Sequence, residues 1–195
     1  MNATRDLLTI NEWSRAGRKL CEVLGIIYHW VGNPGTSAKA NRDYFESRKT
    51  GNLDYGSAHL IIDVDGSVIQ CIPDDEVAYH VGTDKADPAS GGIYTDWARR
   101  VFGQYALFPA TNSPNNCTLG IEMCHLDWDG HFTDATLETA AQLGAVYCRA
   151  YNLDPLTRIG THHGTVGWKD CPRLWTVHPD LFDEFLLEVK RRLSA

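Results

Sequence analysis

Short apolar runs alternate along the chain with longer stretches that follow helical spacing. The short runs are rich in β-branched and aromatic residues, and each predicts a buried strand: residues 24–30, 59–64, 68–72, 119–124 and 158–162. Asp65-Gly66 separates the second run from the third, and this dipeptide strongly favours a tight turn. We therefore expect a hairpin together with further strands.

Three longer stretches repeat their apolar residues at helical spacing: residues 37–49, 133–151 and 179–193. Ser37 and Thr133 stand at the start of the first two and are typical N-cap residues. Between residues 84 and 116 the pattern dissolves into Gly, Pro, Asn and Ser, so we expect a long loop there. Its aromatic residues predict either a substrate-facing surface or a local cluster: Tyr94, Trp97, Phe102, Tyr105 and Phe108.

This mixture of strands and helices predicts an α/β fold with a central mixed β-sheet flanked by α-helices. The chain has 195 residues, which is enough for one well-buried core and short for two. No internal repeat interrupts the pattern. We therefore expect residues 1–195 to form a single domain.

Composition and charge narrow the class of partner. The formal net charge of −7 argues against nucleic acid, because a phosphate-binding surface needs a basic face. No stretch approaches the roughly 20 apolar residues of a membrane span, so we expect none. The first residues lack the apolar centre of a signal peptide. We expect synthesis in the cytoplasm and release by another route, unless a leader has been removed.

The six cysteines are scattered without a CxxC pair, so most predict small buried side chains rather than a disulfide framework. Cys171, which precedes Pro172, needs a different interpretation. His29 ends the first predicted strand, and His162-His163 follow the last one. Two imidazoles and a thiolate suit zinc (Zn²⁺) and leave open the fourth position that a catalytic zinc site requires.

Spacing alone is a weak signal for this site. A single histidine at the end of a core strand, such as His29, is more often a packed or hydrogen-bonded residue than a ligand. Neighbouring histidines on an extended strand point to opposite faces, so only one of His162 and His163 would bind the same ion. Cys171 is the better candidate, because the adjacent proline restricts the loop that holds it.

Several motifs strengthen this interpretation: Gly25-Ile26-Ile27-Tyr28-His29-Trp30, Ala78-Tyr79-His80-Val81-Gly82, Leu119-Gly120-Ile121-Glu122, and Thr161-His162-His163 followed by Lys169-Asp170-Cys171-Pro172. In this order they resemble the type-2 N-acetylmuramoyl-L-alanine amidases. That family includes phage endolysins, prophage lysins and bacterial autolysins, and is related to the peptidoglycan recognition proteins. The resemblance covers nearly the whole chain and implies the same mixed-sheet fold.

The resemblance implies that His29 is the first zinc ligand and Cys171 the last. In the most similar branch of the family, eight steps separate the second histidine from the cysteine. His163 stands eight residues before Cys171 and His162 nine. The residues upstream align best when His162 is the ligand and Trp168 is an insertion. We expect His162, with His163 as the alternative.

The resemblance also implies catalytic roles for two charged residues. Glu122 would orient or deprotonate the attacking water, and an acid within an apolar strand itself favours a functional interpretation. Lys169 would stabilise the oxyanion, unless it is an ordinary solvated loop lysine. His59 and His80 would line the cleft and bind sugar or peptide, or would be hydrogen-bonded structural histidines.

The implied activity is zinc-dependent hydrolysis of the amide bond between N-acetylmuramic acid and L-alanine in bacterial peptidoglycan. Two alternatives stay open: a peptidoglycan-binding module without catalysis, and a zinc amidase that acts on soluble muropeptides. Binding modules of this fold usually lack the cysteine ligand, whereas Cys171 is present. We expect a monomer without a separate cell-wall-binding domain, acting on the wall after release from the cell.

Overall fold

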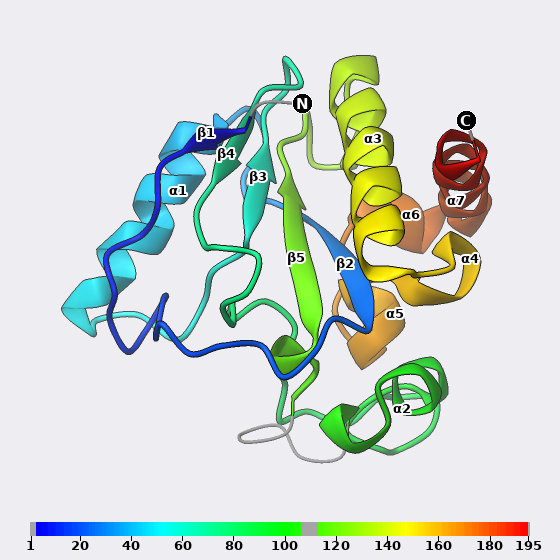
Figure 1. The fold of residues 1–195 in the computed structure, drawn as a ribbon, viewed down its shortest axis with the longest axis horizontal. Coiled ribbons are helices and arrows are strands. Elements are labelled where there is room, and N and C mark those ends of the chain that lie inside the picture. The colour runs from blue at the N-terminus through cyan, green and yellow to red at the C-terminus, as the bar shows by residue number, and fades with distance from the viewer. Residues whose placement is uncertain (1–2, 107–112, 195) are drawn as a thin grey trace.

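The computed structural model describes residues 3–106 and 113–194, which form one mixed β-sheet surrounded by helices (Figure 1). The strands are β1 (Thr4–Arg5), β2 (Gly25–Trp30), β3 (Leu60–Ile62), β4 (Val68–Gln70), β5 (Thr118–Met123) and β6 (Ile159–Thr161). Their order in the sheet is β1-β4-β3-β5-β2-β6. Only the β3–β4 pair is antiparallel, and it is the hairpin that Asp65-Gly66 predicts. The predicted fold class is confirmed.

The α-helices are α1 (Ala38–Ser47), α2 (Asp96–Phe102), α3 (Asp134–Tyr151), α4 (Pro155–Arg158), α5 (His162–Val166), α6 (Arg173–Val177) and α7 (Pro179–Leu193). Short 3-10 turns occupy Arg48–Thr50, Gly103–Ala106 and Pro114–Asn116. The three predicted helices are confirmed. Ser37 and Thr133 cap α1 and α3 as expected, because each side chain accepts a backbone N–H of the first turn.

Two of our expectations about local structure were wrong. The stretch 84–116 is not a continuous loop, because Thr95 caps α2 and its hydroxyl oxygen accepts the N–H of Ala98. Phe102 of this helix is 1% exposed and packs in a cluster with residues distant in the sequence, such as Ile27 and Val166, which the sequence pattern does not reveal. The last predicted strand ends at Thr161 rather than at residue 162, and α5 begins at His162.

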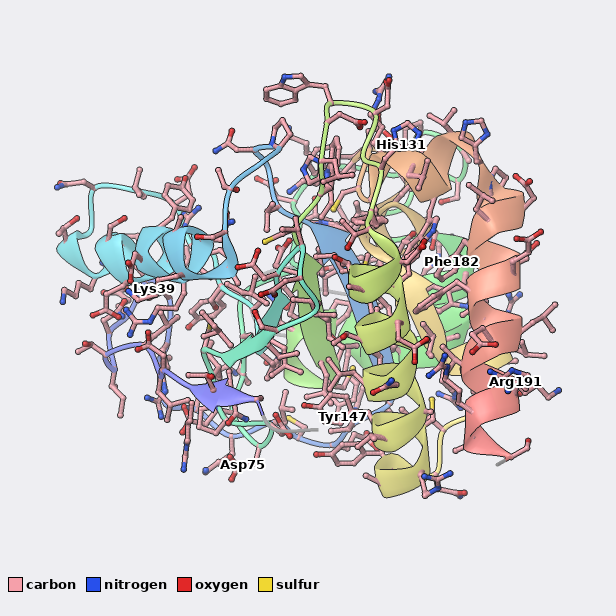
Figure 2. All side chains as sticks on the ribbon, turned by 90° about the horizontal axis from the view of Figure 1, so that it is seen from above. Lys39, Asp75, His131, Tyr147, Phe182 and Arg191 are labelled. Carbon is pink, nitrogen blue, oxygen red and sulfur yellow. The ribbon has the colours of Figure 1, made fainter. Side chains whose placement is uncertain are left out.

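One face of the sheet carries the main apolar core. Alternate residues of the central strands, such as Tyr28 on β2 and Ile121 on β5, belong to the same core cluster as Val189 of α7. Helices α3 and α7 lie side by side along this face (Figure 1), and Phe182 lies between them (Figure 2). The hydroxyl of Tyr28 donates to the carbonyl of Ala140 in α3 at 2.8 Å.

The opposite face of the central strands carries polar chemistry. His29 and Glu122 are register partners on β2 and β5, so their side chains project from the same side of the sheet. Their parity is opposite to that of Tyr28 and Ile121, which enter the main core. Strand β2, which carries the predicted ligand His29, and strand β5, which carries the predicted acid Glu122, are therefore neighbours in the buried centre of the sheet.

The described residues also bear on two expectations about composition. All six cysteines are free thiols, and five of them are buried, as predicted for scattered cysteines; Cys21 is exposed. Within residues 3–106 and 113–194, no helix has the length and apolar content needed to cross a membrane.

Replacement of Tyr28 by Phe tests the link between the sheet and α3. The variant loses the buried hydroxyl that donates to Ala140, and one such bond contributes about 1 kcal/mol net to the free energy of unfolding. Tyr55→Phe is the control, because the bond from Tyr55 to Glu12 is exposed. Urea denaturation followed by circular dichroism should show a lower stability for Tyr28→Phe and little change for Tyr55→Phe. Equal stabilities would contradict the assignment.

Candidate metal centre and its surroundings

Three potential metal ligands converge at the end of β2. The Nδ1 atoms of His29 and His162 lie 3.0 Å apart, and the Sγ of Cys171 lies 3.8 Å from the Nδ1 of His29. The three ligand atoms all lie within 4.8 Å of one another, and the side chains are buried. Residues that are far apart in the sequence thus form one compact group of two nitrogens and a sulfur.

Backbone structure fixes each member of this group. His29 is the fifth residue of β2, where it pairs with Glu122 across the sheet. His162 opens α5 directly after β6, and Thr161 caps that helix by accepting the N–H of Gly164 at 2.8 Å. Cys171 is tied to α5 because its carbonyl accepts the N–H of His163 at 2.8 Å. A cis peptide bond joins Cys171 to Pro172.

His163 is turned away from the three candidate metal ligands. Its Nδ1 lies 3.1 Å from the carbonyl oxygen of Lys169, and the residue is partly exposed. Because α5 begins at His162, the two histidines are successive residues of a helix rather than of a strand, but they still point in different directions. This geometry supports His162 over His163 as the second ligand.

Burial determines the protonation of the three side chains in the absence of a cation. It lowers the pKa of His29 and of His162 well below the usual histidine range, and positive charge on Lys169 adds to both effects. Burial also raises the pKa of the Cys171 thiol to about 12. A bound cation would reverse this preference at Cys171, because a coordinating thiol is deprotonated outright.

The donor set fits zinc. Zinc prefers imidazole nitrogen and thiolate sulfur, and three protein donors are the usual complement of a catalytic site. A second group of potential ligands, Asp127, Asp129 and His131, lies on the loop between β5 and α3. There the side chain of Asp127 accepts the N–H groups of residues 129 to 131, as in an ordinary Asx turn.

Glu122 is the register partner of His29 and is partly buried as a residue, and its Oε2 atom is fully buried. Its Oε2 atom has no hydrogen-bond partner among the described residues. Burial raises the pKa of Glu122 to about 8, and the positive charge of Lys169 partly opposes that shift. A carboxyl with a pKa near neutrality and a free oxygen is suited to accept or return a proton. Lys169 itself is exposed.

His59 and His80 are both buried, and the ring nitrogens of each have protein partners. The Nδ1 of His59 accepts the backbone N–H of Gly120 at 2.9 Å, and its Nε2 lies 2.8 Å from the carbonyl of Glu76. His80 lies between His29 and Thr118, at 3.0 Å and 3.1 Å. Contact of these histidines with substrate stays a prediction, and their present partners favour the alternative of hydrogen-bonded structural residues.

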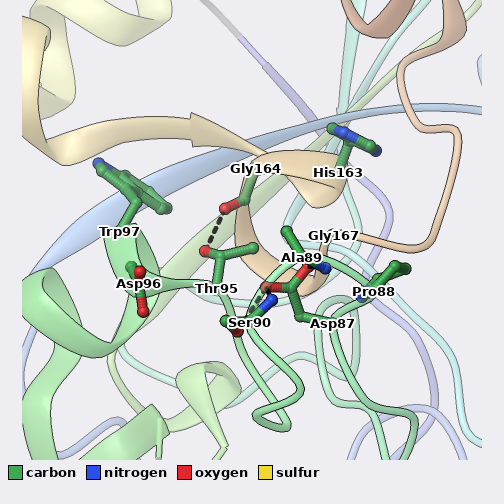
Figure 3. Close-up of a pocket in the computed structure, with 10 residues that line it drawn as sticks. All are labelled: Asp87, Pro88, Ala89, Ser90, Thr95, Asp96, Trp97, His163, Gly164 and Gly167. Atoms are coloured by element: carbon green, nitrogen blue, oxygen red, sulfur yellow. Dashed lines mark hydrogen bonds between the residues drawn. The ribbon is translucent and has the colours of Figure 1, made fainter.

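The aromatic residues of the 84–116 stretch are mainly a packed cluster. Tyr94 and Phe102 are buried in a core that includes Ile27. Phe108 lies outside the described residues. Trp97 differs, because it helps to line a cavity of about 440 Å³ with His163 and Gly164 of α5 (Figure 3). None of the candidate metal ligands His29, His162 and Cys171 lines this cavity.

Sequence reasoning missed the contribution of Gly120. A Cβ atom at this position would lie 2.5 Å from the Cγ of His80, so the bare backbone leaves room for the imidazole to lie against β5. Gly160 plays the same part on β6, where a Cβ would lie 2.3 Å from the ring of Trp97. The spacing of Gly120 and Glu122, two residues apart on one strand face, was the available signal.

Replacement of Gly120 by Ala should therefore displace His80. Overpacking of this kind costs about 1–3 kcal/mol of unfolding free energy. Gly32→Ala is the matched control, since a Cβ there would meet no atom within 4 Å. Urea denaturation of both variants in the presence of a chelator checks the effect on the metal-free protein. A Gly120→Ala variant as stable as Gly32→Ala would contradict the proposed close contact.

Known proteins match this chain along most of its length. The profile of the N-acetylmuramoyl-L-alanine amidase family matches residues 19–174. N-acetylmuramoyl-L-alanine amidase BlyA of Bacillus subtilis (strain 168) is 31% identical over 192 residues, which cover 98% of this chain and 48% of that protein. A probable N-acetylmuramoyl-L-alanine amidase of Bacillus licheniformis is 33% identical over 170 residues, with coverages of 87% and 42%. The chain spans about half the length of these relatives.

Solved structures share the fold. The catalytic domain of XlyA superposes with a TM-score of 0.68 at 22% identity, covering 97% of this chain and 99% of that domain. The solution structure of the PlyG catalytic domain gives a TM-score of 0.69 at 18% identity, with coverages of 100% and 97%. At these identities the likeness concerns the fold alone.

Proposed function

The chain belongs to the N-acetylmuramoyl-L-alanine amidase family, and from this premise we propose that it is a zinc-dependent amidase. Its substrate would be the amide bond between N-acetylmuramic acid and the first L-alanine of the stem peptide in bacterial peptidoglycan. The observation that carries the proposal is the convergence of His29, His162 and Cys171 within 4.8 Å. The buried carboxyl of Glu122, on the strand next to His29, supports it.

His29, His162 and Cys171 would hold the zinc ion. Zinc, when bound, would supply Lewis-acid chemistry, polarising the amide carbonyl and lowering the pKa of water toward about 7. The proposal assigns the second ligand to His162, because His163 is directed to the carbonyl of Lys169. Cys171 also argues against a purely binding module, since a thiolate ligand in a buried site suits catalysis as well as retention of the metal.

Glu122 and Lys169 would act on the reacting atoms. The carboxylate of Glu122 would take a proton from the attacking water and return it to the leaving amine, and its unpartnered Oε2 is available for this. Lys169 is exposed but acts electrostatically on Glu122 and on all three ligands. Its ammonium group would stabilise the oxyanion that forms on the carbonyl.

Metal removal provides the direct test. Purified Gram-positive cell walls incubated with the protein should yield new L-alanine amino termini without new reducing sugar ends, as identified by mass spectrometry. The activity should disappear with a chelator and return with zinc. Cleavage that is indifferent to chelation, or binding to walls without cleavage, would refute the proposal. Replacing the walls with soluble muropeptides separates the two substrate classes.

The role of Glu122 is tested by Glu122→Gln, which keeps the shape of the side chain and removes its basicity. We expect kcat to fall by about 100- to 10,000-fold, the usual contribution of a general acid–base group. Glu184→Gln, on the exposed surface of α7, is the matched control and should retain full activity. Zinc content measured by atomic absorption should be similar in both variants. Full activity of Glu122→Gln would overturn the role.

A further inference from the structure

A chain of hydrogen bonds leads from a backbone carbonyl to the first ligand histidine. The hydroxyl of Thr118 lies 2.7 Å from the carbonyl oxygen of Pro114 and 3.1 Å from the Nε2 of His80. The Nδ1 of His80 lies 3.0 Å from the Nε2 of His29. The remaining ring nitrogen of His29, Nδ1, faces His162 and Cys171. Of these groups, only His29, His162 and Cys171 have a role in the reaction proposed above.

The direction of each hydrogen bond follows from the first. A carbonyl oxygen can only accept, so Thr118 donates its single hydroxyl hydrogen to Pro114. The hydroxyl oxygen must then accept from the Nε2–H of His80. Neutral His80 consequently carries a lone pair on Nδ1, which accepts from the Nε2–H of His29. Neutral His29 is left with a bare lone pair on Nδ1, the atom that faces the other two ligands.

The opposite tautomers would break this chain. If His29 carried its proton on Nδ1, its Nε2 lone pair would face His80, which would have to protonate its own Nδ1. The Nε2 lone pair of His80 would then face the oxygen of Thr118, whose hydrogen is engaged by Pro114. One buried hydrogen bond would be lost, so the observed arrangement selects one tautomer of each ring.

This chain of hydrogen bonds, called the relay below, is closed to solvent. Thr118 is 0% exposed, His29 1% and His80 8%. The backbone N–H groups of His80 and Val81 both donate to the side-chain oxygen of Asn115, at 3.0 Å and 2.8 Å. Gly120 leaves the space that the ring of His80 occupies. Burial and these additional contacts therefore hold the ring of His80 between Thr118 and His29.

We propose that Thr118 and His80 are positioning residues that fix His29 in the tautomer whose Nδ1 binds a divalent metal ion. The inference rests on the proposed function in one respect, because it assumes that the ion is bound by His29, His162 and Cys171. Groups that hydrogen-bond to a ligand histidine commonly change metal affinity by about 10- to 100-fold. In this protein the hydroxyl of Thr118, two hydrogen bonds away from His29, would affect metal affinity in this way.

The test compares two substitutions of one residue. Thr118→Val keeps the shape but removes the hydroxyl that accepts from His80, whereas Thr118→Ser keeps the hydroxyl. The carbonyl of Pro114 retains a donor in both variants, since the N–H of Cys117 lies 3.0 Å from it. Zinc dissociation constants are measured by competition with a chromophoric chelator. We expect Thr118→Val to bind zinc about 10- to 100-fold more weakly and Thr118→Ser to bind within about threefold of wild type.

A second measurement needs no variant. Nitrogen-15 chemical shifts of the imidazole rings in the metal-free wild-type protein report which nitrogen carries the proton. The relay requires protonated Nε2 and bare Nδ1 on both His29 and His80, and any other pair of tautomers would overturn it. This spectrum remains decisive even if Thr118→Val does not fold.

The outcomes separate the two proposals. A wild-type protein that binds no zinc would refute the proposed metal-dependent function. A wild type that binds zinc, together with a folded Thr118→Val variant of equal affinity, would refute only the relay. Weaker binding by both Thr118→Val and Thr118→Ser would also refute it, because the hydroxyl would then be irrelevant to the loss.

Discussion

The register between β2 and β5 is the constraint on which the candidate site depends. Parallel pairing sets His29 opposite Glu122, and pairing of Tyr28 with Thr161 on the other side brings His162 to the same place. Because successive residues of a strand face opposite ways, a slip by one residue would send the ligand toward α3 and bring Tyr28 to the polar face. The apolar contacts that hold Tyr28 in the main core therefore also hold His29 beside the other two candidate metal ligands.

The two faces of the sheet make different contributions. The face under α3 and α7 buries the largest of three apolar clusters, and this burial stabilises the fold. The other face buries histidines and a carboxyl, groups whose desolvation is unfavourable unless they find partners. Small residues make this possible, since Gly120 and Gly160 allow the rings of His80 and Trp97 to lie directly on the strands. A polar site of this kind can persist because the first face stabilises the shared strands.

The sequence predicts the strands and the long helices and singles out the candidate metal ligands, but it reveals the contacts between them only in part. Apolar runs and caps are local signals, and they suffice to predict β2, β5, α1, α3 and α7. Helix α2 was not predicted, because its burial depends on contacts with residues distant in the sequence. The start of α5 at His162, which turns His163 outward, depends on the cap formed by Thr161. The side-chain partners of His80 come from two segments that are far apart in the sequence, residue 29 and residues 115–118, so no spacing rule would reveal them.

The hydrogen-bond relay ends on the main-chain carbonyl of Pro114, and this has a consequence for mutagenesis. Every amino acid carries a carbonyl oxygen, so no substitution at position 114 can delete the acceptor that orients the whole series. A scan that replaces each side chain in turn would detect effects at Thr118 and His80. It would not detect the carbonyl of Pro114, which sets the direction of their hydrogen bonds. Replacing the peptide bond itself by an ester, which weakens the carbonyl as an acceptor, would expose a determinant that is silent in any library of natural residues.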